Sequence, residues 1–186
     1  MRPPPSYGQT FGRIEGDVTL VAGPFVALGA RAPRFGIDLG VRYASTVGVY
    51  GTFEDALGSS EPAPRRVVAT GLEMRPLFLA RWLTEKEFEK PRLDLTLDSL
   101  SLGLGAWWGF DPSPLGPPGL EARAEIGTPI LATPTGPWIA ARVTGRWSYG
   151  TLLGNTPVGP QDRALVVSIV LRWEQLVSLG LPEALQ

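Results

Sequence analysis

The chain has 186 residues, a formal net charge of −1, 23 glycines and 19 prolines, and it contains neither cysteine nor histidine. This length suits one domain, and the lack of a basic excess argues against a nucleic-acid partner. Without cysteine or histidine the chain has no disulfide, no thiolate nucleophile and neither of the commonest transition-metal ligands. We therefore expect no metal site, no cofactor and no enzymatic activity.

Apolar and polar residues alternate with a period of two along most of the chain, and this pattern predicts β-strands. Seven long alternating segments follow one another, at residues 13–32, 36–54, 66–82, 93–104, 120–126, 139–147 and 165–173. Bacterial single-chain membrane barrels have an even number of strands, so we expect an eighth from a break at Gly23-Pro24. The alternation slips by one residue near Ser99, which predicts a β-bulge there.

The segment GIDLGVRYASTVGVYGTF, residues 36–53, shows how the two faces differ. One parity is apolar, as at Leu39 and Val41, and the other holds Asp38 and Arg42 beside Gly and Ala. The interior of an eight-stranded barrel is only just wide enough for its side chains, so long charged residues there need small neighbours. We therefore expect the charged face to point into a lumen and the apolar face to point toward lipid.

The two signs of charge nearly balance on the polar parity, which favours paired charges in a closed interior. We expect a lumen network of ion pairs, either structural or pore-lining. Its predicted members are Arg13, Glu15, Asp17, Asp38, Arg42, Glu73, Arg75, Asp94, Asp98, Glu121, Arg123, Glu125, Arg142, Arg146, Arg172 and Glu174.

Large aromatic residues lie mostly toward the ends of the alternating segments, as in the interfacial girdles of a membrane barrel. The predicted girdle residues are Tyr43, Trp82, Trp108, Trp138, Trp147 and Trp173. The links alternate between compact ones, at 32–34 and 131–136, and longer ones rich in Pro and Gly, at 55–65, 110–119 and 151–162, with 84–90 intermediate. Short turns at one end and long loops at the other are typical of outer-membrane barrels.

These features predict an all-β fold, a closed antiparallel up-and-down transmembrane β-barrel of eight strands with a charged lumen and an apolar exterior. The barrel domain is expected at residues 11–174. A Pro-rich flexible N-terminus, residues 1–10, precedes it, and a C-terminal tail, residues 175–186, follows it.

The segments GLEMRPLFLARWL and LDLTLDSLSLGLGAWWG set mixed charges opposite continuous apolar faces. In this they resemble small outer-membrane β-barrel proteins, especially uncharacterised ones of myxobacteria and their relatives. The segment LVVSIVLRW resembles the assembly signal that ends such proteins, although thirteen residues follow Trp173 here. The resemblance implies a place in the bacterial outer membrane, with no signal peptide within this chain. It also implies a lipid bilayer, lipopolysaccharide and the barrel assembly machinery as partners.

Three functions fit this reading of the sequence. The first is a small outer-membrane barrel with a salt-bridged, plugged lumen and a structural, adhesive or interaction role. The second is a narrow pore or a lipid-binding membrane barrel of the same architecture. The third is a soluble lipocalin-like barrel that carries an apolar ligand and points its Leu, Val and Trp residues inward.

Overall fold

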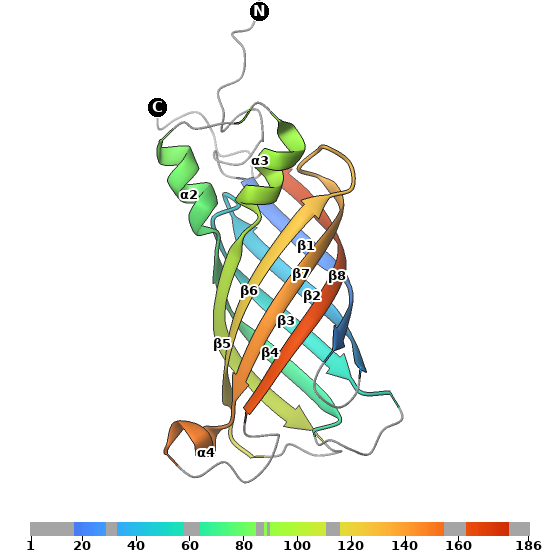
Figure 1. The fold of residues 1–186 in the computed structure, drawn as a ribbon, viewed down its shortest axis with the longest axis vertical. Coiled ribbons are helices and arrows are strands. Elements are labelled where there is room, and N and C mark those ends of the chain that lie inside the picture. Colours follow the sequence, from blue (N-terminus) through green and yellow to red (C-terminus); the bar gives the residue numbers. More distant parts are fainter. Residues whose placement is uncertain are drawn as a thin grey trace, which may run out of the picture.

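Eight antiparallel strands close into one barrel in the computed structural model, in the order β1 to β8 with β8 paired back to β1 (Figure 1). The structure describes residues 17–28, 33–57, 64–84, 88, 90–110, 116–154 and 163–178. The strands are β1 Asp17–Leu28, β2 Pro33–Tyr43, β3 Val47–Asp55, β4 Arg66–Met74, β5 Ser101–Phe110, β6 Gly119–Pro129, β7 Gly136–Trp147 and β8 Arg163–Ser178. This arrangement confirms the predicted closed eight-stranded barrel.

The described residues form three helices outside the strands, at the two ends of the barrel. Helices α2, Pro76–Leu83, and α3, Pro91–Asp98, lie between β4 and β5 at the end where β1 begins and β8 stops, which we call the α2–α3 end. Helix α4, Tyr149–Leu152, follows β7 at the opposite end, which we call the α4 end. None of the helices in the described ranges is long and apolar enough to cross a membrane.

The eighth strand does not come from a break at Gly23-Pro24, because β1 runs through both residues. β1 and β8 are not paired at these two positions, so the missing N–H of Pro24 interrupts no hydrogen bond between the two strands. A Cβ on Gly23 would lie 2.2 Å from the carbonyl oxygen of Leu171, so only glycine allows β8 to approach β1 this closely.

The extra strand arises instead from a tight turn inside residues 36–54. Thr46 N–H donates to the carbonyl oxygen of Tyr43 at 3.0 Å, and Ala44 and Ser45 between them have φ of 46° and 53°. Two central residues with positive φ define the type I′ turn that suits the twist of a hairpin. Tyr43 pairs with Val47 across three intervening residues, so the alternation keeps its parity through the turn. The predicted single strand is therefore the hairpin of β2 and β3.

The strands predicted at 66–82 and 93–104 were also wrong in part, because each contains a helix. β4 ends at Met74, and Pro76 and Pro91 each open a helix, where proline is well tolerated. The alternation LDLTLD, residues 93–98, places Asp94 and Asp98 four residues apart, which is also one face of a helix. The phase slip near Ser99 is thus the change from α3 to β5, and no bulge occurs there.

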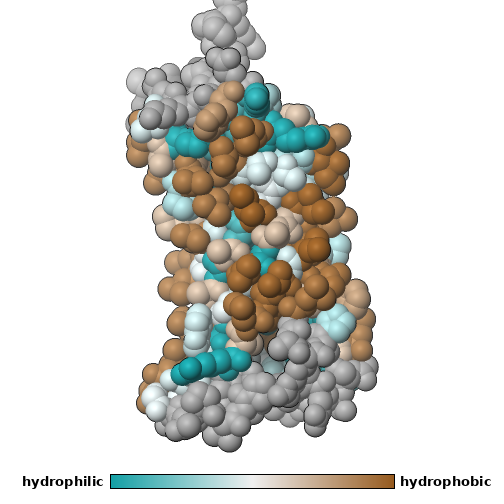
Figure 2. All heavy atoms as spheres, in the orientation of Figure 1, coloured by the Kyte–Doolittle hydropathy of each residue, from teal (hydrophilic) through white to brown (hydrophobic). Residues whose placement is uncertain are grey.

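Apolar side chains cover the outside of the barrel and charged ones fill the inside, as predicted. Outward residues such as Leu39, Leu72 and Leu104 are 55%, 68% and 58% exposed, whereas Asp38, Arg42 and Glu73 are at most 4% exposed. Figure 2 shows apolar side chains over much of the height of one face of the wall.

The expected contrast between short links at one end and long links at the other is correct for four of the predicted links and wrong for 29–32 and 75–100. Three links lie at the α2–α3 end: the short links 44–46 and 130–135 and the long link 75–100, which contains α2 and α3. Four links lie at the α4 end: the short link 29–32 and the longer links 56–65, 111–118 and 148–162. β8 also continues to Ser178, beyond the expected domain boundary at residue 174.

Candidate functional site: the charged lumen

Six arginines and six carboxylates point into the barrel and are almost completely buried. Because the two numbers are equal, this set of lumen charges has no net charge. The members are Arg42, Arg75, Arg123, Arg142, Arg146 and Arg172 with Asp38, Glu54, Glu73, Glu121, Glu125 and Glu174.

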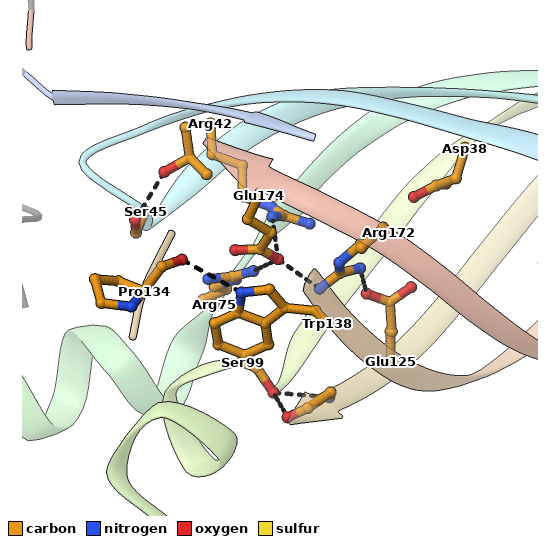
Figure 3. Close-up of polar contacts among 12 residues, drawn as sticks. Asp38, Arg42, Ser45, Arg75, Ser99, Glu125, Pro134, Trp138, Arg172 and Glu174 are labelled. Atoms are coloured by element: carbon orange, nitrogen blue, oxygen red, sulfur yellow. Dashed lines mark hydrogen bonds and ion pairs between the residues drawn. The ribbon is translucent and has the colours of Figure 1, made fainter. Parts of the chain in front are cut away.

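Glu174 of β8 is the centre of the lumen charges nearest the α2–α3 end (Figure 3). Its Oε1 lies 3.1 Å from Nη1 of Arg42, 3.0 Å from Nη2 of Arg75 and 2.8 Å from Nη2 of Arg172. Arg75 follows β4, and desolvation by burial, with repulsion from Arg42 next, lowers its pKa to about 10. The guanidinium of Arg75 is therefore still charged at neutral pH, and Glu174 holds it at the mouth of the barrel.

Arg42 does not pair with Asp38, its nearest candidate along β2. Its Nε lies 2.5 Å from Oε1 of Glu73, and its Nη1 reaches Glu174. Asp38 instead lies 2.8 Å from Nη2 of Arg142 and 3.5 Å from Nη1 of Arg123. Residues four apart in one strand are two pleats apart, so partners from other strands lie closer.

Glu125 and Glu73 link these groups across the lumen. Glu125 Oε2 accepts from Nε of Arg142 at 2.7 Å, and its Oε1 accepts from Nη1 of Arg172. Glu73 Oε2 accepts from Nη2 of Arg123. Each of these carboxylates is bonded to two guanidinium groups, so the charges form a connected network rather than separate pairs.

A second group of lumen charges centres on Arg146. This guanidinium binds both oxygens of Glu54, at 2.9 and 2.6 Å, and its Nε donates to Oε2 of Glu121 at 2.7 Å. The hydroxyl of Tyr50 donates to the other oxygen of Glu121 at 3.1 Å. The Tyr50 ring also lies 3.3 Å from the guanidinium carbon of Arg123, which places a cation over its face.

Buried apolar clusters lie beyond the lumen charges toward both ends of the barrel. Near the α4 end, one buried cluster joins β1, β7 and β8, and another joins β4 and β5. The first cluster consists of Phe25, Ala27, Ala140, Val166 and Val170. The second consists of Val67, Ala69 and Trp107. At the α2–α3 end, Trp138 packs against Leu95 of α3. The charged layer is thus enclosed between apolar layers.

Two predicted members of the network lie elsewhere. Asp94 and Asp98 are buried on α3, where Arg81 of α2 binds both, with 2.8 Å between its Nη1 and Oδ1 of Asp98. They join the two helices rather than fill the lumen, because the residues 93–98 form a helix and not a strand. Arg13, Glu15 and the side chain of Asp17 lie outside the described residues.

The sequence interpretation missed Glu54 and Tyr50. Both have the same parity as Asp38 and Arg42 in the alternating segment, so their inward direction could have been predicted. Their partners could not, because Glu121 and Arg146 come from β6 and β7.

The predicted aromatic girdle is correct for some positions and wrong for Trp138. Tyr43 and Trp173 are exposed on the outer wall at 51% and 53%. Trp108 and Trp147 are half-buried at outward positions near the α4 end. Trp138 is 2% exposed because it shares the inward parity of Arg142, and the side chain of Trp82 lies outside the described residues.

No group of three or more potential ligands is arranged to hold a metal ion among the described residues. Each carboxylate of the lumen has an arginine nitrogen within 3.1 Å of one of its oxygens. This arrangement can hold the strands together, and it leaves none of these six carboxylates without an arginine partner.

Several solved structures are similar to this chain, and three of them illustrate the likeness. The N-terminal β-barrel domain of Pseudomonas aeruginosa OprF is 12% identical with a TM-score of 0.44, and the match covers 87% of this chain and 98% of that one. A barrel from a study of de novo design of transmembrane β-barrels is 10% identical with a TM-score of 0.42, and the match covers 87% of this chain and 97% of that one. Ail, the attachment invasion locus protein of Yersinia pestis, solved in complex with the heparin analogue sucrose octasulfate, is 15% identical with a TM-score of 0.41, and the match covers 88% of this chain and 100% of that one. The sequence matches no protein-family model and no curated protein. At these identities nothing about function follows from the likeness.

Proposed function

We propose that this chain is a small integral barrel of the bacterial outer membrane, with a plugged lumen and a structural, adhesive or interaction role. The observation that carries the proposal is the apolar outer wall, because every strand contributes an exposed large apolar side chain. One example from each strand, in order, is Leu20, Ile37, Val49, Leu72, Leu104, Ile126, Ile139 and Ile169.

Such a wall is costly in water. Soluble monomers rarely expose contiguous apolar patches larger than a few hundred Å2, and here the apolar side chains surround the barrel. The strands have 9 to 16 residues, enough to cross a bilayer that tilted strands of about 9 to 11 residues can span. A closed ladder also leaves no unpaired strand edge in the hydrocarbon.

The soluble lipocalin-like hypothesis needs the opposite orientation of the two faces. Its apolar residues would have to line the interior and its charged residues would have to face water. The described strands place Asp38, Arg42 and Glu73 inside and Leu39 and Val41 outside. This hypothesis is therefore not retained.

The buried ion pairs of the lumen support a plugged, structural barrel over a pore. Ion pairs cross the interior between strands on different sides, as from Arg146 of β7 to Glu54 of β3 and from Arg123 of β6 to Asp38 of β2. The apolar clusters beyond them would have to be hydrated before an ion could pass. We infer that the barrel conducts no measurable current and catalyses no reaction.

The outer membrane follows in this proposal from the closed β-architecture and from the resemblance of the sequence to small outer-membrane barrels. Its partners are then the surrounding bilayer, lipopolysaccharide and the machinery that inserts such barrels.

Membrane extraction tests this proposal. The protein is produced in a bacterium, and its membranes are washed with plain buffer and then with detergent. We expect the protein to stay in the membrane until detergent is added. Recovery of a soluble folded monomer in plain buffer would refute a membrane barrel. Purified protein in a planar bilayer then tests the plug, and we expect no channel steps; reproducible conductance would refute the plugged lumen while leaving the membrane barrel intact.

A further inference from the structure

A groove of about 520 Å3 lies on the outer wall across β6, β7 and β8, toward the α4 end. Its lining includes Ala122 and Ala124 of β6, Gly145 and Trp147 of β7, and Arg163 of β8. The strands that carry it face the viewer in Figure 1.

The groove exists because small residues meet there on adjacent strands. Ala122 pairs directly with Gly145, and Ala124 pairs with Val143. Most other outward positions of the wall hold Leu, Ile or Val, so these small side chains leave a furrow between their larger neighbours. The inward-pointing Arg123 and Arg146 contribute to its floor between the small residues.

Gly145 has a further role, because the outer edge of the Trp147 indole packs against it. A Cβ added at Gly145 would be 2.8 Å from Cη2 of that ring. The indole therefore lies along the wall instead of projecting from it. An amphipathic indole in this position is typical of the level where lipid headgroups meet acyl chains.

Arg163 stands beside this indole, since it pairs with Trp147 at the start of β8 and is exposed. It forms no ion pair with another described residue. The exposed Arg66 at the same end differs, because its Nε binds Oδ2 of Asp55 at 2.9 Å. The groove is thus lined mostly by apolar side chains, and at its rim stands Arg163, a cation with no ion-pair partner among the described residues.

We propose that this groove binds one anionic phospholipid, with an acyl chain along Ala122 and Ala124, beside the Trp147 indole, and the phosphate at Arg163. The inference rests on the proposed membrane location. The charge at the rim selects an anionic headgroup, and the narrow furrow suits an extended chain. A second copy of this protein is the alternative occupant, but the carboxylate of Asp55 on its outer wall is already paired with Arg65 and Arg66.

Native mass spectrometry of the protein in detergent tests the proposal with phosphatidylglycerol and phosphatidylcholine as the two probes. We expect one phosphatidylglycerol to be retained in preference to phosphatidylcholine. Arg163→Gln should weaken this binding about fivefold, as expected for about 1 kcal/mol per basic residue at an anionic lipid surface. Ala124→Leu should weaken the binding of both lipids, because it fills the furrow.

Two matched variants serve as controls. Arg66→Gln removes an exposed arginine at the same end but outside the groove, and Ala22→Leu enlarges an outward alanine on β1. Neither should change lipid retention.

Equal retention of the two lipids by the wild type, or equal losses in Arg66→Gln and Arg163→Gln, would overturn the lipid site. A lipid-free dimer that Ala124→Leu dissociates would assign the groove to a second copy and also overturn it. If the wild type requires detergent yet shows no lipid preference, only this inference fails, whereas solubility in plain buffer removes the proposed function itself.

Discussion

Replacing Glu174 with Gln should destabilise the barrel strongly, because one carboxylate oxygen serves three buried arginines. After the change Arg42 keeps Glu73 and Arg172 keeps Glu125. Arg75 has no other carboxylate within ion-pair distance among the described residues. Removing one partner of a buried pair costs about 3–5 kcal/mol, so we expect a loss of this size for Glu174→Gln.

A double-mutant cycle isolates the cause of this loss. Arg75→Met should cost less than Glu174→Gln, because Glu174 then keeps Arg42 and Arg172 at 3.1 and 2.8 Å. The double variant leaves no stranded cation, so its cost should fall short of the sum of the single costs by about 0.5–3 kcal/mol.

Equilibrium unfolding of each variant in lipid vesicles with guanidinium chloride measures these free energies, with folding followed by tryptophan fluorescence. A loss below about 1 kcal/mol for Glu174→Gln, the value of solvated pairs, would refute the reasoning. It would mean that water reaches these charges, and it would favour an open lumen.

Three further changes test other parts of the fold by the same unfolding measurement. Val41→Arg places a charge on the outer wall and should cost about 2–4 kcal/mol near the bilayer centre; a neutral result would count against the assigned faces. Ala44→Gly should stabilise the hairpin by about 0.5–1 kcal/mol, because φ is 46° at this alanine, and a loss of stability would contradict the type I′ turn. Ser99→Ala should cost about 1–3 kcal/mol, because the Ser99 hydroxyl donates to the Gly127 carbonyl at 2.7 Å and accepts from the Gly127 N–H at 2.8 Å. Thr133→Ala, at an exposed threonine, is the control, and equal losses of stability in the two variants would speak against this contact.

The direction of each strand face could be predicted from the sequence, because period-two alternation survives in every strand. The same alternation concealed the turn at residues 44–46. An odd number of residues separates Tyr43 from Val47, and no Gly, Asn or Pro marks the turn. Positive φ at Ala44 and Ser45 is tolerated here because the flanking strands hold the turn, with Ser45 also bonded to Thr19.

The partners of the lumen charges could not be predicted, because they depend on the register of all eight strands. Arg42 meets Glu73, 31 positions away, and Glu174, 132 positions away. The alternation determines that the side chains of Arg42, Glu73 and Glu174 point inward, but it does not determine how far along the barrel axis each of them lies. The helices at 76–83 and 91–98 were missed for a related reason, since a six-residue alternation also places residues four apart on one helical face.

Lipid-dependent quenching of a fluorophore at Leu39 tests the central claim most directly, namely that the apolar wall faces lipid. The chain has no cysteine, so Leu39→Cys can carry a single label, and Leu153→Cys at the α4 end serves as the water-exposed reference. Leu39 is 55% exposed on the outer wall in the middle of β2. In vesicles with brominated acyl chains, the account predicts strong quenching at Leu39, greatest for bromine deep in the chain, and weak quenching at Leu153. Absence of quenching at Leu39 in the folded protein would contradict a membrane-embedded barrel.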